Sequence, residues 1–258
     1  SAILEGVASL LESGATHPTL ELLFTTGEEH FCVGAKAFDA ERLQSKTAYV
    51  MDLSGPVGDC AVAAPTLITF SAEVAGKAAH AGFAPEDGVH AIQVAAAAVA
   101  NLPSGRWGDV TVNVGTISGG RATNIVPDSC TVTGEIRALC HQDALDRLNE
   151  IHSEFVEQAQ AVDAKLNFNH TIHITGYRVD TDAPVAQRFR RACAAVGVVP
   201  RFTDTYGGSD CNILSAHGIQ GLVVATAMNN CHAVNEYTTV EELCKAGRLA
   251  QALMEKQD

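Results

Sequence analysis

The sequence is 258 residues long, and 47% of its residues are hydrophobic and 18% are charged. This composition is typical of a chain that buries a core, and it argues against wholesale disorder. Seventeen basic residues against 30 acidic ones leave a net charge of −13, which disfavours nucleic acid and an anionic membrane surface as partners because like charges repel. No apolar run approaches the roughly 20 residues that span a bilayer, so we expect no membrane partner either.

The first predicted elements follow an α/β pattern. Apolar residues at helical spacing predict a helix over 2–11, and the apolar run 20–26 predicts a buried strand. A short helix over 34–40 and a short strand over 48–51 follow, and a turn comes directly after Asp52.

A different pattern begins near Pro65. The sequence predicts a strand, a helix, two strands, a helix and a strand, at residues 66–75, 87–100, 110–116, 130–137, 141–161 and 166–174. The last strand alternates with period 2, with Leu166, Phe168 and Ile174 on one face. The order β-α-β-β-α-β is the ferredoxin-like arrangement.

The α/β pattern returns after Tyr177. Helices are expected over 184–196, 209–216 and 240–255, and strands over 200–203 and 221–225. The predicted fold class is therefore α/β, with a discontinuous domain interrupted by a ferredoxin-like domain. The domains are assigned to residues 1–63 with 177–258, and to residues 64–176.

Eight cysteines are spread along the chain, and none forms a C-x-x-C pair. Several lie in apolar stretches, such as Cys130 and Cys193. We expect buried, reduced thiols and therefore a reducing, cytoplasmic location.

Two carboxylates follow the predicted strand 20–26 directly. Adjacent residues in an extended segment point in different directions, so Glu28 and Glu29 can divide two tasks. One carboxylate can ligate a metal while the other meets a bound water, as hydrolysis with a metal-activated water requires. Taken alone, the pair also fits solvated loop charges.

Other candidates also lie at strand ends. Asp52 ends a strand, where sites of α/β folds collect, but it also fits a turn-forming Asp. His232 follows a strand and a polar loop, and imidazole is a common zinc ligand, although a lone loop His is more often a surface residue.

Two glycine-rich segments are also candidates. His80 lies among small residues in 76–82 that would let a ligand approach the backbone, or it makes a local hydrogen bond. Gly207, Gly208 and Ser209 precede a helix, whose start can bind an anion or be capped by the serine. A P-loop, a G-x-S-x-G elbow and an H-E-x-x-H helix are absent from the sequence.

Six motifs in one order resemble a known family. They are TTGEE at 25–29, YVMD at 49–52, GKAAHAG at 76–82, GGRATNIVP at 119–127, GGSDCN at 207–212 and HAVNEY at 232–237. Together they resemble the co-catalytic di-zinc metallopeptidases that include peptidase T, carboxypeptidase G and the aminoacylases, and most of all the peptidase T-like branch. The likeness spans nearly the whole chain.

The resemblance implies a role for each matching residue. It makes Glu28 the general base, Glu29 and His232 ligands of one zinc ion, and Asp52 a ligand of the other. The ferredoxin-like domain would be the lid and dimerisation domain, and its His80 would stabilise the oxyanion, typically in the partner's active site. The substrate-binding positions would be Asn124, Arg137, Gly208 and Ser209.

The implied activity is that of a zinc-dependent exopeptidase on short peptides, most of all a tripeptide aminopeptidase that works as a homodimer. A carboxypeptidase or an N-acyl amino acid amidohydrolase of the same family is the alternative, and an inactive binding or dimerisation protein is another. The family's remaining ligands, a His and a bridging Asp, lie upstream of the two glutamates and are not matched. We therefore expect this chain to be an incomplete catalytic unit that binds zinc poorly.

Overall fold

The computed structural model describes residues 1–256, and the chain divides into two units. Unit 1 consists of residues 1–64 together with the stretch from residue 177 onward, and unit 2 consists of residues 65–176. No helix within residues 1–256 combines the length and the apolar composition that crossing a membrane requires.

Unit 1 is built on a mixed five-stranded sheet. Its strands are β1 (Thr47–Ser54), β2 (Asp59–Ala64), β8 (Tyr177–Arg178), β9 (Arg201–Asp204) and β10 (Gln220–Met228). β10 lies between β1, to which it is parallel, and β2, to which it is antiparallel. β2 then pairs antiparallel with β8 and parallel with β9. Because β2 and β10 are buried along nearly their whole length, the core of the unit lies around them.

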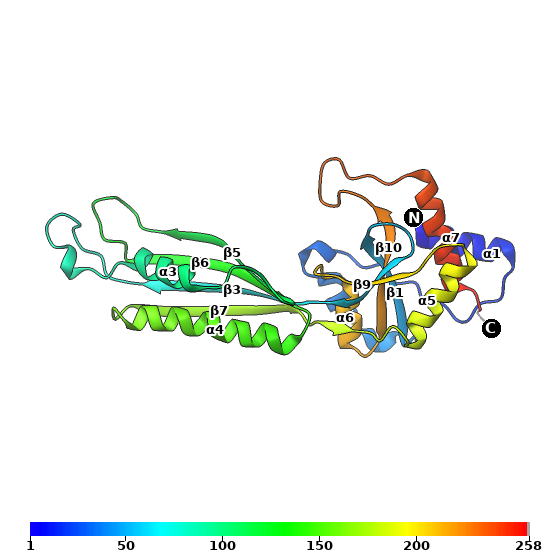
Figure 1. The fold of residues 1–258 in the computed structure, drawn as a ribbon, viewed down its shortest axis with the longest axis horizontal. Coiled ribbons are helices and arrows are strands. Elements are labelled where there is room, and N and C mark those ends of the chain that lie inside the picture. Colours follow the sequence, from blue (N-terminus) through cyan, green and yellow to red (C-terminus); the bar gives the residue numbers. More distant parts are fainter. Residues whose placement is uncertain (257–258) are drawn as a thin grey trace. The chain divides into compact units, whose positions relative to one another are not determined.

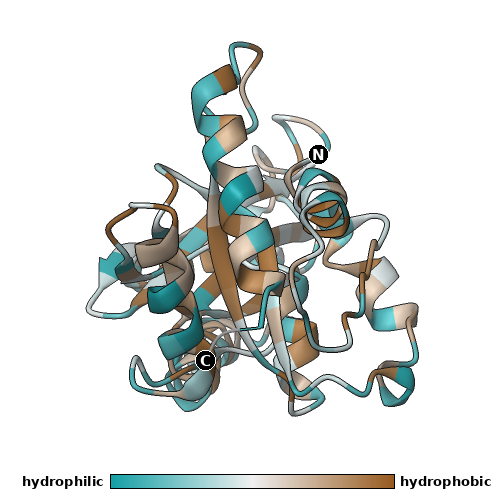
Figure 2. Cartoon of the chain, turned by 90° about the vertical axis from the view of Figure 1, so that its right-hand side faces the viewer, coloured by the Kyte–Doolittle hydropathy of each residue, from teal (hydrophilic) through white to brown (hydrophobic). Residues whose placement is uncertain are grey.

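Helices cover both sides of this sheet. They are α1 (Ala2–Ser13), α2 (Val33–Ala37), α5 (Pro184–Ala195), α6 (Asp210–Ala216) and α7 (Val240–Met254). Figure 1 shows α1, α5 and α7 on one side of the strands and α6 on the other. Phe189, Leu222 and Leu249 are fully buried where the helices meet the sheet. Figure 2 shows hydrophobic strands at the centre and hydrophilic positions on the helices around them.

Unit 2 is an antiparallel sheet with two helices. Its strands are β3 (Thr66–Ala75), β4 (Gly105–Trp107), β5 (Val110–Gly119), β6 (Ser129–Ala138) and β7 (Lys165–Ile174), in the spatial order β4-β5-β6-β3-β7. The helices α3 (Ala91–Asn101) and α4 (His141–Gln160) share one core with the strands. The strand order confirms the ferredoxin-like prediction, and the two units together confirm the α/β class.

The predicted elements agree with the structure at most positions, and the differences have local causes. Helix α3 begins at Ala91 rather than near Asp87 because the His90 ring accepts a hydrogen bond from the Gln93 N–H (3.2 Å) and caps it. The short strands β2, β4 and β8 were not predicted.

The predicted buried strand over 20–26 is wrong. The structure places no strand there, and Leu22 and Phe24 are 46% and 62% exposed. Within residues 1–256 the sheet ends at β1, which pairs with β10 alone. In that part of the chain the segment therefore has no neighbouring strand with which to pair.

Candidate active site

The first part of the site is a strained turn between the segment 20–26 and α2. Gly27, Phe31 and Cys32 all have positive φ angles, of 65°, 59° and 58°. The Gly34 N–H donates to the Thr26 carbonyl (2.9 Å), and a Cβ on Gly34 would lie 2.3 Å from that oxygen. The chain therefore folds back on itself and holds the Glu28–His30 3₁₀ turn in one conformation.

The second part is the turn that follows β10. Asn230 and His232 have positive φ angles of 54° and 64°, and Ala227, near the end of β10, has one of 60°. Backbone bonds between Asn229 and Tyr237 close the turn, at 3.0 and 3.1 Å. These two turns and the end of β10 carry five of the six positive-φ residues other than glycine in residues 1–256. Backbone strain of this kind gathers at functional sites.

A β-bulge sets the position of Asp52. The β1–β10 pairing runs from Val50 opposite Val223 to Leu53 opposite Ala225, so three steps on β1 face two on β10. Asp52 lies inside this irregularity. Bulges beside active sites commonly re-aim a side chain.

The structure brings four of the predicted site residues together. His232 Nδ1 lies 3.5 Å from Glu29 Oε1. Burial raises the pKa of Glu28, and the negative charges of Asp52, Glu29 and Asp210 raise it further. Desolvation raises the pKa of Asp52, and the negative charges of Asp210 and Glu29 raise it further. His232 lowers this pKa, and Asp52 as a whole residue is exposed. The charges of Glu28, Glu29, Asp52 and His232 thus act on one another.

The Glu29–His232 pair fits a metal by its chemistry, but it is only part of a ligand set. Both side chains are largely exposed, at 69% and 74%, so the pair contributes little to stability and is open to a ligand. Carboxylate and imidazole are zinc donors, and zinc takes three or four protein ligands. Within residues 1–256, no group of three or more His, Cys, Asp or Glu side chains is arranged to hold a metal ion.

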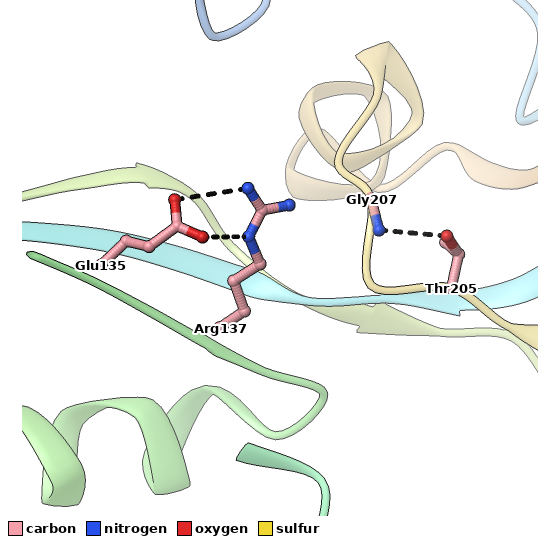
Figure 3. Close-up of polar contacts among 4 residues, drawn as sticks. All are labelled: Glu135, Arg137, Thr205 and Gly207. Carbon is pink, nitrogen blue, oxygen red and sulfur yellow. Dashed lines mark hydrogen bonds and ion pairs between the residues drawn. The ribbon is translucent and has the colours of Figure 1, made fainter. Parts of the chain in front are cut away.

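The loop before α6 is engaged in capping. Ser209 is 3% exposed, its hydroxyl accepts from the Cys211 N–H (3.2 Å), and its own N–H donates to Asn212 Oδ1 (3.1 Å). The structure therefore shows the N-cap alternative for the Ser209 side chain. Figure 3 shows the Gly207 N–H donating to Thr205 Oγ1 (3.1 Å), which fixes the start of the loop beside Gly208.

Asp210 is a residue that the sequence reasoning missed. It directly follows Ser209, and its carboxylate accepts a hydrogen bond from Thr25 Oγ1. Its charge acts on both Glu28 and Asp52. Its presence in the GGSDCN motif was the available signal, but its neighbours on the distant 25–32 segment could not be read from the sequence.

In unit 2, His80 and Asn124 lie on adjoining loops. The Ala81 N–H donates to the Asn124 carbonyl (3.0 Å), and His80 pairs with Ile125. The Gly82 N–H donates to His80 Nδ1 (3.2 Å), so a neutral His80 ring carries its proton on Nε2. The Phe83 ring packs against the His80 ring with the centroids 4.3 Å apart and the planes tilted by 32°, and Phe83 is itself 86% exposed.

Arg137 lies at the other end of unit 2. It is near the C-terminal end of β6, and Figure 3 shows its ion pair with Glu135 (2.9 Å). Asn124 precedes the start of the same strand, at Ser129. Eight strand residues span about 26 Å. The structure therefore does not bring Arg137 together with His80 and Asn124 within one chain.

Comparisons with known proteins agree with this fold. Residues 62–163 match the model of the peptidase dimerisation domain. The uncharacterized protein YqjE of Bacillus subtilis is 32% identical over 99% of this chain and 69% of its own length. The crystal structure of aminopeptidase PepT from Bacillus cereus is 35% identical with a TM-score of 0.93, over 98% of this chain and 68% of that one. A tripeptidase from Staphylococcus aureus is 27% identical with a TM-score of 0.95, over the same shares of the two chains.

The family model, the relatives and the structural neighbours indicate a metallopeptidase or amidohydrolase, and members of this family typically bind metals. The chain belongs to the M20 peptidase family and is peptidase T-like. It spans about two thirds of the length of YqjE and of the two structures, and 54–62% of the length of curated peptidase T relatives.

Proposed function

We propose that the protein is a zinc-dependent exopeptidase that hydrolyses short peptides, and specifically a tripeptide aminopeptidase. The observation that carries the proposal is the half-buried Glu28 beside the exposed Glu29–His232 pair. The aminopeptidase and the tripeptidase among its structural neighbours support the choice of substrate class.

In this proposal Glu29 and His232 would hold one ion and Asp52 would help to hold a second. Bound zinc supplies a Lewis acid that acidifies water and polarises a carbonyl. Glu28 takes a proton from the attacking water and gives it to the leaving amine. In the metal-free chain, burial and the neighbouring carboxylates raise the pKa of Glu28.

His80 would donate its Nε2 proton to the oxyanion, since Nδ1 is occupied by Gly82. Its separation from Arg137 along β6 places the two groups too far apart to contact one substrate within one chain. Together with the match to the peptidase dimerisation domain, this supports a homodimer in which His80 and Asn124 serve the partner's site, and Arg137 would bind the substrate carboxylate. Sedimentation velocity at micromolar concentration should show a dimer, and a monomer would contradict this arrangement.

The decisive experiment is a substrate panel on the natural gene product loaded with zinc. We expect tripeptides to be cleaved at the N-terminal residue, with little turnover of N-acyl amino acids or C-terminally blocked substrates. Preferred cleavage of N-acyl amino acids or of C-terminal residues would replace aminopeptidase by amidohydrolase or carboxypeptidase.

One substitution tests the role of Glu28. Glu28→Ala should abolish turnover while zinc content stays near normal, and His30→Ala, an exposed neighbour in the same turn, should keep turnover. Loss of zinc in Glu28→Ala would count against the assignment of this residue as the base.

We also propose a cytoplasmic location. All eight cysteines are free thiols, and five of them are buried. Such thiols persist in a reducing compartment.

A further inference from the structure

Asp210 is a half-buried carboxylate that the proposed chemistry leaves without a task. One of its oxygens accepts the hydrogen bond from Thr25 Oγ1, and the other, Oδ1, is buried with no hydrogen-bond partner. It lies beside Glu28 and Asp52, whose like charges make an additional carboxylate unfavourable there.

The position of Asp210 is itself rigid. Ser209 and Asn212 bond each other reciprocally at the start of α6, and they are 3% and 1% exposed. Asp210 is the first residue of that helix. Its carboxylate therefore projects from a fixed point.

Asp210 lies next to both arms of the turn that carries Glu28 and Glu29. Thr25 is on the arm before the turn. On the arm after it is Cys32, which is 2% exposed and has its Sγ 3.9 Å from Glu28 Oε1. Burial and the charges of Asp210 and Glu28 raise the pKa of Cys32 to about 12, so its thiol stays protonated and donates to Glu28.

We propose that Asp210 is a positioning residue that acts through Thr25: their hydrogen bond fastens the Glu28–Glu29 turn to the start of α6. The claim that this fastening aims Glu28 rests on the proposed function, whereas the fastening itself does not. Five backbone bonds report on the turn, donated by the N–H groups of His30, Phe31, Cys32, Val33 and Gly34.

The test uses variants that keep or remove the hydrogen bond between Thr25 and Asp210. Thr25→Val and Asp210→Ala remove it, whereas Thr25→Ser keeps the donor and Asp210→Asn keeps an acceptor. Hydrogen exchange is measured on peptides covering 26–34, with peptides from β6 in unit 2 as the internal reference. We expect about tenfold faster exchange over 26–34 in both removing variants, no further increase in the double variant, and near wild-type exchange in the two conservative variants.

Unchanged exchange over 26–34 in Thr25→Val, or additive effects in the double variant, would overturn the proposal. If Asp210→Ala does not fold, the comparison of Thr25→Val with Thr25→Ser decides alone.

A kinetic measurement separates this inference from the proposed function. On the zinc-loaded gene product, Thr25→Val should lower kcat about tenfold with KM nearly unchanged, and Thr25→Ser should restore kcat. A wild-type protein that cleaves no peptide would defeat the proposed function and leave the exchange result to decide the fastening. Faster exchange with unchanged kcat would overturn the claim that the bond aims Glu28.

Discussion

At the scale of single residues, the site depends on backbone conformations that most side chains avoid. Phe31, Cys32 and His232 have φ angles near +60°, where glycine is the ordinary occupant. Their cost is of order 1–3 kcal/mol each. Close packing such as that of Gly34 on Thr26 holds the turn in place, so the site residues depend on neighbours that have no chemistry of their own.

Gly34→Ala tests that dependence. The new Cβ would meet the Thr26 carbonyl at 2.3 Å, and backbone atoms have no free rotamer by which to withdraw. We expect unit 1 to lose about 2 kcal/mol of stability in urea unfolding, a typical cost of overpacking. Gly207→Ala is the matched control, because its Cβ would make only an ordinary 3.5 Å contact and its stability should change by less than about 0.5 kcal/mol. Equal stabilities of the two variants would show that the turn gives way easily.

The raised pKa of Glu28 predicts a pH dependence in the metal-free chain. A carboxyl whose pKa is higher in the folded state binds more protons there than in the unfolded state. Stability therefore falls as pH rises from the pKa of the unfolded state to the raised pKa of the folded state. Glu28→Gln should therefore be no more stable than wild type near pH 3 and more stable near pH 7. Glu12→Gln, at an exposed position of α1, should show no such crossover. A gain that is equal at both pH values would contradict the burial and charge argument.

At the scale of elements, periodic patterns were predictive and pairing was not. The strands Thr66–Ala75 and Val110–Gly119 and the helix His141–Gln160 follow their periodicities closely. β2, with the sequence DCAVAA, is too short and too rich in alanine to show a period, although its residues are among the most buried in the chain. The segment 20–26 has strand-like residues, but no strand within residues 1–256 lies beside it. The sequence pattern of a segment does not say which strand, if any, lies beside it.

The packing of α1 on α7 gives an element-scale prediction. A Cβ on Gly6 would lie 2.9 Å from the Ala250 Cβ and 2.9 Å from the Gln251 nitrogen, so the two helices approach closely only because Gly6 has no side chain. Gly6→Val should cost about 2 kcal/mol in thermal or urea unfolding.

The control for Gly6→Val is Ala8→Val on the exposed side of α1, which carries only the helix-propensity cost of about 0.5 kcal/mol. If both variants lose equal stability, the contact between α1 and α7 is not the constraint that the structure indicates.

The candidate site could be named from the sequence but not assembled from it. Glu28, Glu29, Asp52 and His232 each have an ordinary explanation when taken alone, and only the six ordered motifs outweighed it. The bulge that places Asp52 and the Thr25–Asp210 bond both join segments far apart in the chain. They follow from tertiary pairing, which single-sequence patterns do not encode.

At the scale of the whole molecule, unit 1 carries the candidate residues Glu28, Glu29, Asp52 and His232, and unit 2 carries the candidates His80, Asn124 and Arg137. Membership in the M20 peptidase family accounts for this division, because the match to the peptidase dimerisation domain coincides largely with unit 2. The chain spans about two thirds of its structural relatives. The number of metal ions that the side chains of this chain hold is therefore the quantity to measure.

A zinc titration of the 258-residue chain, after removal of metals by a chelator, tests the assignment of Glu29 and His232 as metal ligands most directly. We expect one weakly held zinc ion per chain, because Glu29 and His232 form a pair without a third ligand in residues 1–256. This ion should be lost in His232→Ala and retained in His30→Ala. Two tightly bound ions, or binding that survives His232→Ala, would contradict the assignment of the metal site.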